Sequence, residues 1–421
     1  MPIENAQQGT SNISLRGRLS LRRWASAIGL LLIFGVGLER ILAVPITTTG
    51  EKILQFQFET KTQGSPGDPF VWSPDGRRLL SGMTMRDSSG EVRASLWLFD
   101  VADDKAVGHR VLDGRGAAIA GIAWSLDGEL VAIVERRQIR VFSARDFSEI
   151  AHREISTGDP ELDNLQRINL SSGVAFSKDS KSLWIARPAE NVRNRFTLAV
   201  ELDAHSLSVI GHYDIDPPIA GNRTGAFRTA IEATPNGPRL VALVDSHTGI
   251  IVLGADTARD FVYGIDLSTK AELFPHFQLV DKNRRFQGLA ELLLSSDTST
   301  VASFLGVTTD RRQDLQDYRD VDVYRTETGQ RIALLDTAQT LKDEQTARKF
   351  FGRTSEVVIA TSHRRSDKAP GLIAYDVKSG AIVQRITGQA LDPRLAFSLD
   401  RKRMVGGLIY SPVMQFYSVN R

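Results

Sequence analysis

The chain has 421 residues, of which 42% are hydrophobic and 24% are charged, a composition that allows a large buried core. Its 52 lysines and arginines balance 50 aspartates and glutamates, and the net charge of +2 argues against a protein that coats nucleic acid. The chain has no cysteine, which excludes disulfides, thiolate metal sites, cysteine nucleophiles and a lipidated cysteine anchor.

The N-terminal 44 residues have the pattern of an export signal. A basic tail, residues 1–23, precedes a mainly apolar segment, residues 24–44; the tail carries Arg16, Arg18, Arg22 and Arg23. Arginines before an apolar helix hold that end in the cytoplasm, so we predict a membrane-anchoring helix with an extracytoplasmic remainder, periplasmic or extracellular. Two charged residues shorten the apolar run. Cleavage after Ala43, which would give a secreted protein, and a core helix therefore stay open as alternatives.

After a linker, residues 45–50, the rest of the chain (51–421) consists of short apolar runs separated by Gly, Asp, Ser and Thr turns, the pattern of many short strands. The stretch "VWSPDGRRLL" (71–80) repeats with variations every 46 to 61 residues. Its first turn residue and the equivalents are Ser73, Ser125, Ser177, Thr234, Ser295, Gly352 and Ser398. A period of this length is typical of propeller blades with extended loops.

A second marker, an apolar residue followed by a turn, lies within each repeat, as at Phe99-Asp100 and Leu202-Asp203. Each repeat therefore predicts four strands. The last repeat ends at Arg421 without a fourth strand, and the unassigned stretch "EKILQFQFE" (51–59) is the candidate to supply it. Pairing it there would close a ring and remove two open sheet edges.

"WSPDGRRL" (72–79) and its relatives resemble the WD-repeat-like repeats of bacterial β-propellers, including TolB-like, lactonase-like and quinoprotein-like propellers. The resemblance covers about residues 50–421 and implies an all-β, seven-bladed propeller. The Gly-His and Trp-Asp dipeptides of true WD repeats do not occupy their usual positions. The resemblance therefore specifies a fold far better than a function.

Ser73 to Gly76 suits a type I turn, with a side-chain acceptor first and proline second. The residue before the turn is large and apolar in six of the seven repeats, as at Trp72 and Trp124. An aromatic side chain of this kind buries on the order of 150 to 250 Å², so we predict that these residues are wedges between adjacent blades.

The turns after the first and third strands are short, whereas the other two connections vary in length and emerge together at one face of a propeller. Arg115, Arg167 and Arg285 each lie ten residues before a turn marker, a register that predicts positions near the mouth of the central channel. Convergent guanidinium groups there would hold a carboxylate, a phosphate or an acidic protein segment. His247 and His363, both in predicted long loops, are the histidine candidates for the same face.

Motifs for catalysis are missing from the sequence: it contains no HExxH, no GxSxG, no GxxxxGK[ST] and no GxGxxG after a strand. No motif indicates a cofactor or a metal, and the aspartates of "DLQDYRDVD" (314–322) lack the spacing of a calcium loop, so we interpret them as an ordinary polar loop. The favoured function is a noncatalytic module that binds a protein or small ligand, and no nucleic acid, through its long-loop face. The alternative is a lactonase-like or quinoprotein-like enzyme whose site is assembled at the central channel.

Overall fold

In the computed structural model the described residues are 46–47, 63–86, 92–103, 105–112, 119–135, 138–155, 173–186, 196–216, 223–247, 259–279, 291–295, 297–306, 318–336, 344–351, 356–363, 372–377, 379–386, 395–400, 402–407 and 414–419. All the regular structure in these ranges is β-strand. The predicted helix, 24–44, lies outside them. None of the described segments is a helix of the length and apolarity needed to cross a membrane.

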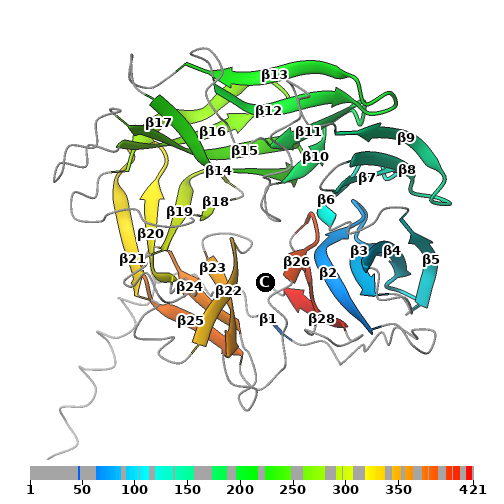
Figure 1. Ribbon diagram of the computed structural model, residues 1–421. Helices are drawn as coiled ribbons and strands as arrows, with labels where there is room; N and C mark the ends of the chain where they lie inside the picture. The colour runs from blue at the N-terminus through cyan, green and yellow to red at the C-terminus, as the bar shows by residue number, and fades with distance from the viewer. Residues whose placement is uncertain are drawn as a thin grey trace, which may run out of the picture. The chain divides into compact units, whose positions relative to one another are not determined.

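The described strands form seven antiparallel four-stranded sheets, numbered I to VII after their order in the chain (Figure 1). Six sheets each use four consecutive strands, which pair with their sequence neighbours. The strands of sheets I to III are β2 (Gln63–Trp72), β3 (Arg78–Arg86), β4 (Val92–Asp100), β5 (Lys105–Val111); β6 (Ile119–Trp124), β7 (Leu130–Glu135), β8 (Gln138–Ser143), β9 (Glu149–Glu154); and β10 (Val174–Phe176), β11 (Ser182–Ala186), β12 (Phe196–Asp203), β13 (Val209–Ile215).

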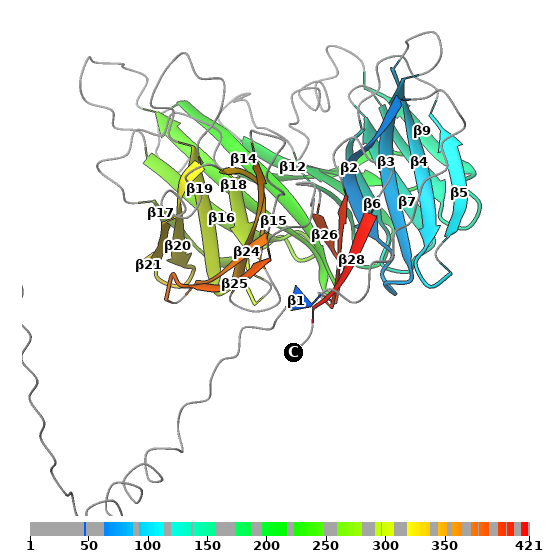
Figure 2. The same ribbon diagram turned by 90° about the horizontal axis from the view of Figure 1, so that it is seen from below.

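The strands of sheets IV to VI are β14 (Arg223–Thr234), β15 (Gly237–His247), β16 (Arg259–Asp266), β17 (Ala271–Gln278); β18 (Glu291–Leu294), β19 (Thr300–Gly306), β20 (Tyr318–Arg325), β21 (Arg331–Asp336); and β22 (Glu344–Phe351), β23 (Glu356–His363), β24 (Leu372–Asp376), β25 (Ile382–Ile386). Figure 2 shows the strand order of sheet I from the side. The prediction of four strands per repeat is therefore confirmed for these six sheets.

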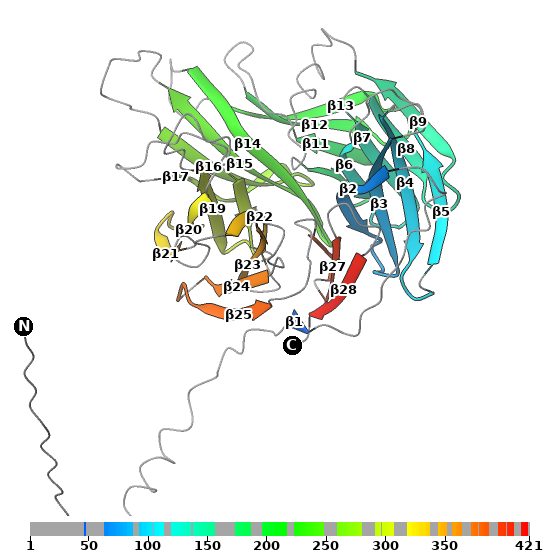
Figure 3. The same cartoon turned by 60° about the horizontal axis from the view of Figure 1, so that its bottom comes forward.

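Sheet VII joins the two ends of the chain. It consists of β26 (Leu395–Phe397), β27 (Arg403–Gly407), β28 (Met414–Val419) and, beside β28, the N-terminal strand β1 (Ile46–Thr47) (Figure 3). In this pair Ile46 lies opposite Val419 and Thr47 opposite Ser418. An N-terminal strand thus completes the last sheet, as predicted, but the paired residues described are 46–47, and the predicted segment 51–59 lies outside the described residues.

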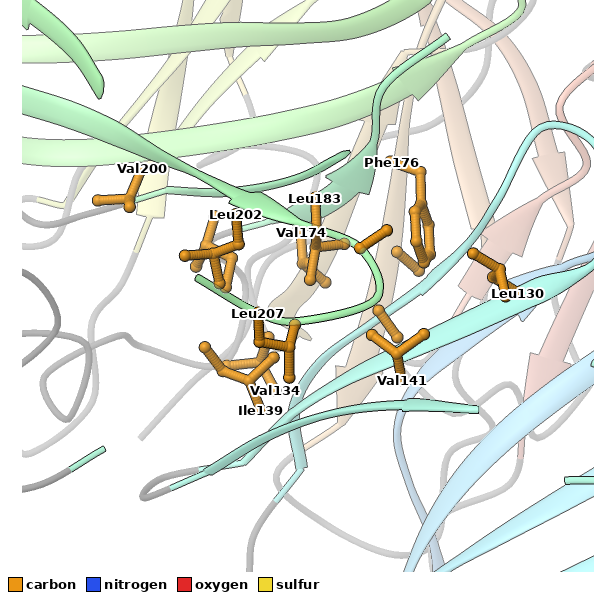
Figure 4. Close-up of a cluster of buried hydrophobic side chains, with 14 of the residues drawn as sticks. Leu130, Val134, Ile139, Val141, Val174, Phe176, Leu183, Val200, Leu202 and Leu207 are labelled. Carbon is orange, nitrogen blue, oxygen red and sulfur yellow. The ribbon is translucent and has the colours of Figure 1, made fainter. Parts of the chain in front are cut away.

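Neighbouring sheets pack face to face, because strands such as β7 carry apolar residues on both faces. All six residues of β7 are buried: Ala132 and Val134 pack toward sheet III, whereas Val131 and Ile133 pack toward sheet I. Figure 4 shows the first of these layers, where Val134 and Val141 of sheet II meet side chains of sheet III such as Leu207. A strand buried on both sides reads as a continuous apolar run, which explains the stretch "LVAIVE".

Shared apolar clusters link the sheets in the order VII, I, II, III, IV, V and VI. The first strands of these sheets also contact one another in that order. Between sheets VII and I the indole N–H of Trp72 donates to the carbonyl oxygen of Ala396 over 3.1 Å. Trp124 belongs to the cluster between sheets I and II, and Phe176 to that between sheets II and III. The predicted role of these residues as wedges is confirmed.

A buried serine fixes the turn between the first and second strands. In sheet II the hydroxyl of Ser125 donates to Asp127 Oδ1 (2.6 Å) and accepts the N–H of Leu130 (2.8 Å), and the N–H of Gly128 donates to the Ser125 carbonyl (3.0 Å). The same side-chain bonds recur in Ser73–Asp75, Ser177–Asp179, Ser295–Asp297 and Ser398–Asp400. Partial burial raises the pKa of Asp127, but its hydrogen bonds together, with those from Ser125 and the Glu129 N–H the largest, bring the pKa below its ordinary value, so this carboxylate stays ionised.

The fourth strands of sheets I to VI carry a β-bulge at one equivalent position, close to the turn from the third strand. The register shifts there by one residue, which leaves one aliphatic residue without a cross-strand partner: Val107, Ile150, Ile210, Leu273, Ile332 and Val383. Because a bulge twists the edge strand and interrupts its hydrogen bonds, it makes the edge a poor template for another strand.

We predict that Trp124→Ala lowers the free energy of unfolding by about 3 to 5 kcal/mol, since it removes a large side chain that is 5% exposed between two sheets. Urea unfolding followed by circular dichroism measures the change. Trp97→Ala is the control, because Trp97 is only partly buried in β4 and should cost less. An unchanged stability for Trp124→Ala would contradict the wedge assignment.

Candidate functional site

The two ends of the sheets differ in the length of their connections. At one end, here the short-turn end, the first strand turns into the second and the third into the fourth; the serine turns lie there. We call the other end the long-connection end. There the second strand of a sheet leads to the third strand, and the fourth strand leads to the first strand of the next sheet. Residues 248–258 and 307–317, for example, make such connections. Variable connections on a repeated scaffold are where binding residues concentrate.

Two of the five predicted site residues lie in the described part of the chain. His247 is the last residue of β15 and His363 the last of β23, so both are in strands that end at the long-connection end, and not in loops as predicted. By register, His247 lies opposite Arg223 and His363 opposite Glu344. Arg115, Arg167 and Arg285 lie outside the described residues, so their convergence remains a prediction.

The register of sheet IV gathers basic residues at this end. Arg223 pairs with His247 between β14 and β15, and Arg259 pairs with Ser246 between β15 and β16. One step further into the sheet Asp245 lies opposite Asp260. Two arginines and a histidine from three strands therefore occupy one sheet end beside a pair of acids. Sequence spacing alone could not reveal this grouping, because its members are up to 36 residues apart (223 to 259).

A cluster of charged and polar side chains begins at the long-connection end of sheet II and extends along its outer strands toward Glu149, the first residue of β9. We call it the sheet II charge cluster, and it consists of Arg110, Glu135, Gln138, Arg140, Glu149 and His152. Glu135 ends β7 and Gln138 begins β8, on either side of residues 136–137. Arg140, with 7% of its side chain exposed, lies between them: its Nε is 3.5 Å from Glu135 Oε2 and its NH2 donates to Gln138 Oε1 over 2.9 Å.

The outer strands of sheets I and II complete the cluster. NH1 of Arg140 donates to Glu149 Oε2 on β9 over 3.0 Å, and NH2 of Arg110 on β5 is 3.7 Å from the same oxygen. Arg110 NH1 also donates to the carbonyl oxygen of Phe147, and its guanidinium lies over the Phe142 ring at 4.9 Å. His152 of β9 is 3.0 Å from Gln138 Oε1 through its Nε2. The cluster therefore ties sheet I to sheet II through charge-assisted contacts.

Glu135 is a buried acid of the cluster whose carboxyl oxygens accept no hydrogen bond. Its side chain is 1% exposed. Burial raises the pKa of Glu135 to about 7; the nearby positive charge of Arg140 lowers it, and the negative charge of Glu149 raises it further. Glu135 therefore changes its charge near neutral pH, where an ordinary glutamate is fully ionised.

A second buried acid lies in sheet V. Asp320 and Asp322 are in strand β20, so the interpretation of residues 314–322 as a polar loop is wrong at its C-terminal end. The side chain of Asp322 is fully buried and accepts a hydrogen bond from Arg331 NH1 at 3.2 Å. The ion pair with Arg331, which lies in the same sheet, accounts for the burial of this carboxylate, so Asp322 is not a candidate for the functional site. Among the described residues no group of three or more His, Asp or Glu side chains is placed to hold a metal ion.

Comparisons with known proteins show the fold. No protein-family model matches the chain, and no curated protein matches it in sequence. The β-propeller domain of Myceliophteria thermophila Cps50 (Swd1) is similar in structure, with 13% identity and a TM-score of 0.53 over 84% of this chain and 97% of that domain. Kuenenia stuttgartiensis hydrazine synthase is similar with 15% identity and a TM-score of 0.52, over 86% and 97%.

The repeated four-stranded sheets and these likenesses define the chain as a β-propeller protein. At such low identity the likeness extends to the fold alone. The propeller fold is thus confirmed, whereas the number of blades, the closure of the ring and the particular type, TolB-like or lactonase-like, stay predictions.

We predict that Arg140→Gln lowers the free energy of unfolding by about 3 kcal/mol, because it leaves two acids of the sheet II charge cluster without their shared cation. Urea unfolding at pH 8, where Glu135 is mostly ionised, measures the loss. Arg145→Gln is the matched control, since Arg145 is an exposed turn residue of the same sheet. Equal stabilities of the two variants would show that Arg140 contributes nothing.

Proposed function

We propose that the protein is a seven-bladed propeller that is anchored in a membrane, faces an extracytoplasmic compartment and binds a protein or small ligand at its long-connection end. The single observation that carries the binding role is the difference between the two sheet ends. The short-turn end is fixed by repeated serine turns, whereas the long-connection end carries the variable segments together with basic residues of sheet IV.

Closure into a ring is supported by contacts that already link all seven sheets in one row from VII to VI. A direct contact between sheets VI and VII would complete the ring. A closed ring also gives every sheet two neighbours, which the apolar residues on both sheet faces require.

We also propose that residues 51–59 extend the fourth strand of sheet VII. The described part of that strand, β1, pairs with only the last two residues of β28. On the neighbouring sheet I, Val107 and Val111 of β5 are 44% and 42% exposed. In the register of β1, residues 48–51 would face the rest of β28, and residues 52–59 would continue beyond its first residue, Met414. The alternating apolar residues Leu54, Phe56 and Phe58 suit a strand that covers such a surface.

The double variant Phe56→Asp/Phe58→Asp should therefore lower the melting temperature of the full chain by several degrees, because two charges would replace the covering side chains. Gln55→Asp/Gln57→Asp, which changes the opposite face of the same strand, should have little effect. Thermal unfolding of both variants makes the comparison. The proposal fails if the two double variants are equally stable.

Membrane anchoring and export rest on the basic tail and the apolar segment 24–44. With anchoring at the N-terminus the propeller would be held at a membrane surface, with its variable connections available to partners. The carboxylate, phosphate or acidic segment expected to bind follows from the arginines predicted near the channel mouth and from Arg223 and Arg259 in sheet IV.

The absence of cysteine allows one experiment to test both location and binding end. Single-cysteine variants His247→Cys and His363→Cys report on the long-connection end, and His205→Cys, in an exposed turn of sheet III, reports on the short-turn end. Each full-length variant, expressed in its membrane, is labelled with a membrane-impermeant maleimide photo-cross-linker. We expect labelling at all three sites, and cross-linking to one defined partner from residues 247 and 363 only.

Each part of the proposal has its own contradicting outcome. If no site is labelled until the membrane that encloses the cytoplasm is permeabilised, the propeller is not extracytoplasmic. If His205→Cys cross-links the partner as well as the other two, binding is not localised at the long-connection end. Alanine at Arg115, Arg167 and Arg285 together should reduce the cross-linking yield, and an unaltered yield would remove these arginines from the site.

A further inference from the structure

The sheet II charge cluster holds an ionisable group that the binding function does not use. Glu135 is buried between sheets I and II at the base of the connection 136–137, next to the first residue of β6: in register it lies opposite Ile119. Among the described residues the cation paired with Glu135 is Arg140, which directs its NH1 and NH2 to other acceptors, Glu149 and Gln138. Its Nε is within ion-pair distance of Glu135 but makes no hydrogen bond to it.

The described charged and polar groups around Glu135 come from three strands. β8 contributes Arg140 and Gln138, β9 contributes Glu149 and His152, and β5 of sheet I contributes Arg110. β6 contributes no ionisable side chain. With Glu135 ionised, two carboxylates share two guanidinium groups, and Arg110 is also engaged with the Phe147 carbonyl. With Glu135 protonated, Glu149 keeps both cations and the buried carboxyl is neutral, which is the less costly arrangement for a group without hydrogen bonds.

We propose that Glu135 is a proton-binding site that couples external pH to the packing of sheets I and II at the long-connection end. A proton bound there removes the buried negative charge. Its loss leaves an unsolvated carboxylate beside Glu149, at the point where β7 leads into residues 136–137 and on to β8. The effect on packing stands on the cluster geometry alone, and an effect on partner binding rests on the proposed function.

The direction of the pH effect follows from the two pKa values. Because burial raises the pKa of Glu135 from its ordinary value to about 7 in the folded protein, the folded state binds more protons than the unfolded state between these values. Stability is therefore fully present below the ordinary glutamate pKa and is lost as the pH rises through about 7. The unfolding equilibrium changes by at most about tenfold for each unit of the pKa difference.

The test is urea unfolding of the full chain between pH 5 and pH 8.5, for the wild type and Glu135→Gln. We expect the wild-type unfolding constant to rise by a factor on the order of 100 at most across this range relative to Glu135→Gln, which carries no titrating charge. Glu129→Gln, at an exposed position in the serine turn of the same sheet, should keep the wild-type pH dependence. A Glu135→Gln protein with the wild-type pH dependence would overturn the proposal.

Two further variants separate Glu135 from its neighbours. His152→Gln should retain the pH dependence, and its loss in that variant would assign the titration to the histidine instead.

If Glu135→Gln does not fold, Glu149→Gln serves as the test variant. Removal of that negative charge should move the transition to lower pH, and an unmoved transition would overturn the proposal. Absence of any cross-linked partner would contradict the proposed function and would leave the pH dependence of unfolding unaffected.

Discussion

Apolar residues on both faces of a sheet require a neighbouring sheet on each side, and the described packing of sheets I to V follows from that requirement. The strand β7 shows it most plainly, since all six of its residues are buried and alternate residues pack against sheets I and III. A sheet of this kind is stable only between two others. The wedge residues Trp72 and Trp124 contribute because they lie in the clusters where neighbouring sheets meet.

Local hydrogen bonds keep the two ends of the sheets different. At the short-turn end a buried serine bonds to an aspartate and accepts a backbone N–H of the strand that follows; among the described turns this occurs at Ser73, Ser125, Ser177, Ser295 and Ser398. The hydrogen bond from Ser177 is the main reason that the pKa of Asp179 lies below its ordinary value. Residues of this end are occupied by the turn itself, so variation is left to the long-connection end, where His247 and His363 finish their strands.

Ionised groups between apolar sheets are tolerated where they are paired. Asp322 is fully buried and bonds to Arg331 of its own sheet. Arg153 of sheet II, in a comparable way, donates to the carbonyl oxygen of Leu207 in sheet III over 2.8 Å. Leu207 has a φ of 54°, a conformation that costs energy in a residue other than glycine, and its side chain is buried in the cluster between those sheets. Glu135 differs from these groups because its oxygens accept no hydrogen bond, so its charge depends on pH.

The sequence by itself determined the strands, the repeat, the wedge residues and the serine turns, because these depend on local periodicity and on hydrogen bonds within five residues, such as Ser125 to Leu130. It also indicated that an N-terminal strand completes the last sheet, although not that Ile46 and Thr47 do so. Only the tertiary structure decided the bulges, the pairing of Arg223 with His247, and the sheet II charge cluster. In the sequence, the one sign of an unusual glutamate was the charged residue at the end of the apolar run "LVAIVE". The cations of its cluster come from elsewhere: Arg140 lies in another strand, and Arg110 lies in another sheet. Strand register and packing between distant segments bring such groups together, and neither can be predicted from the local pattern of residues.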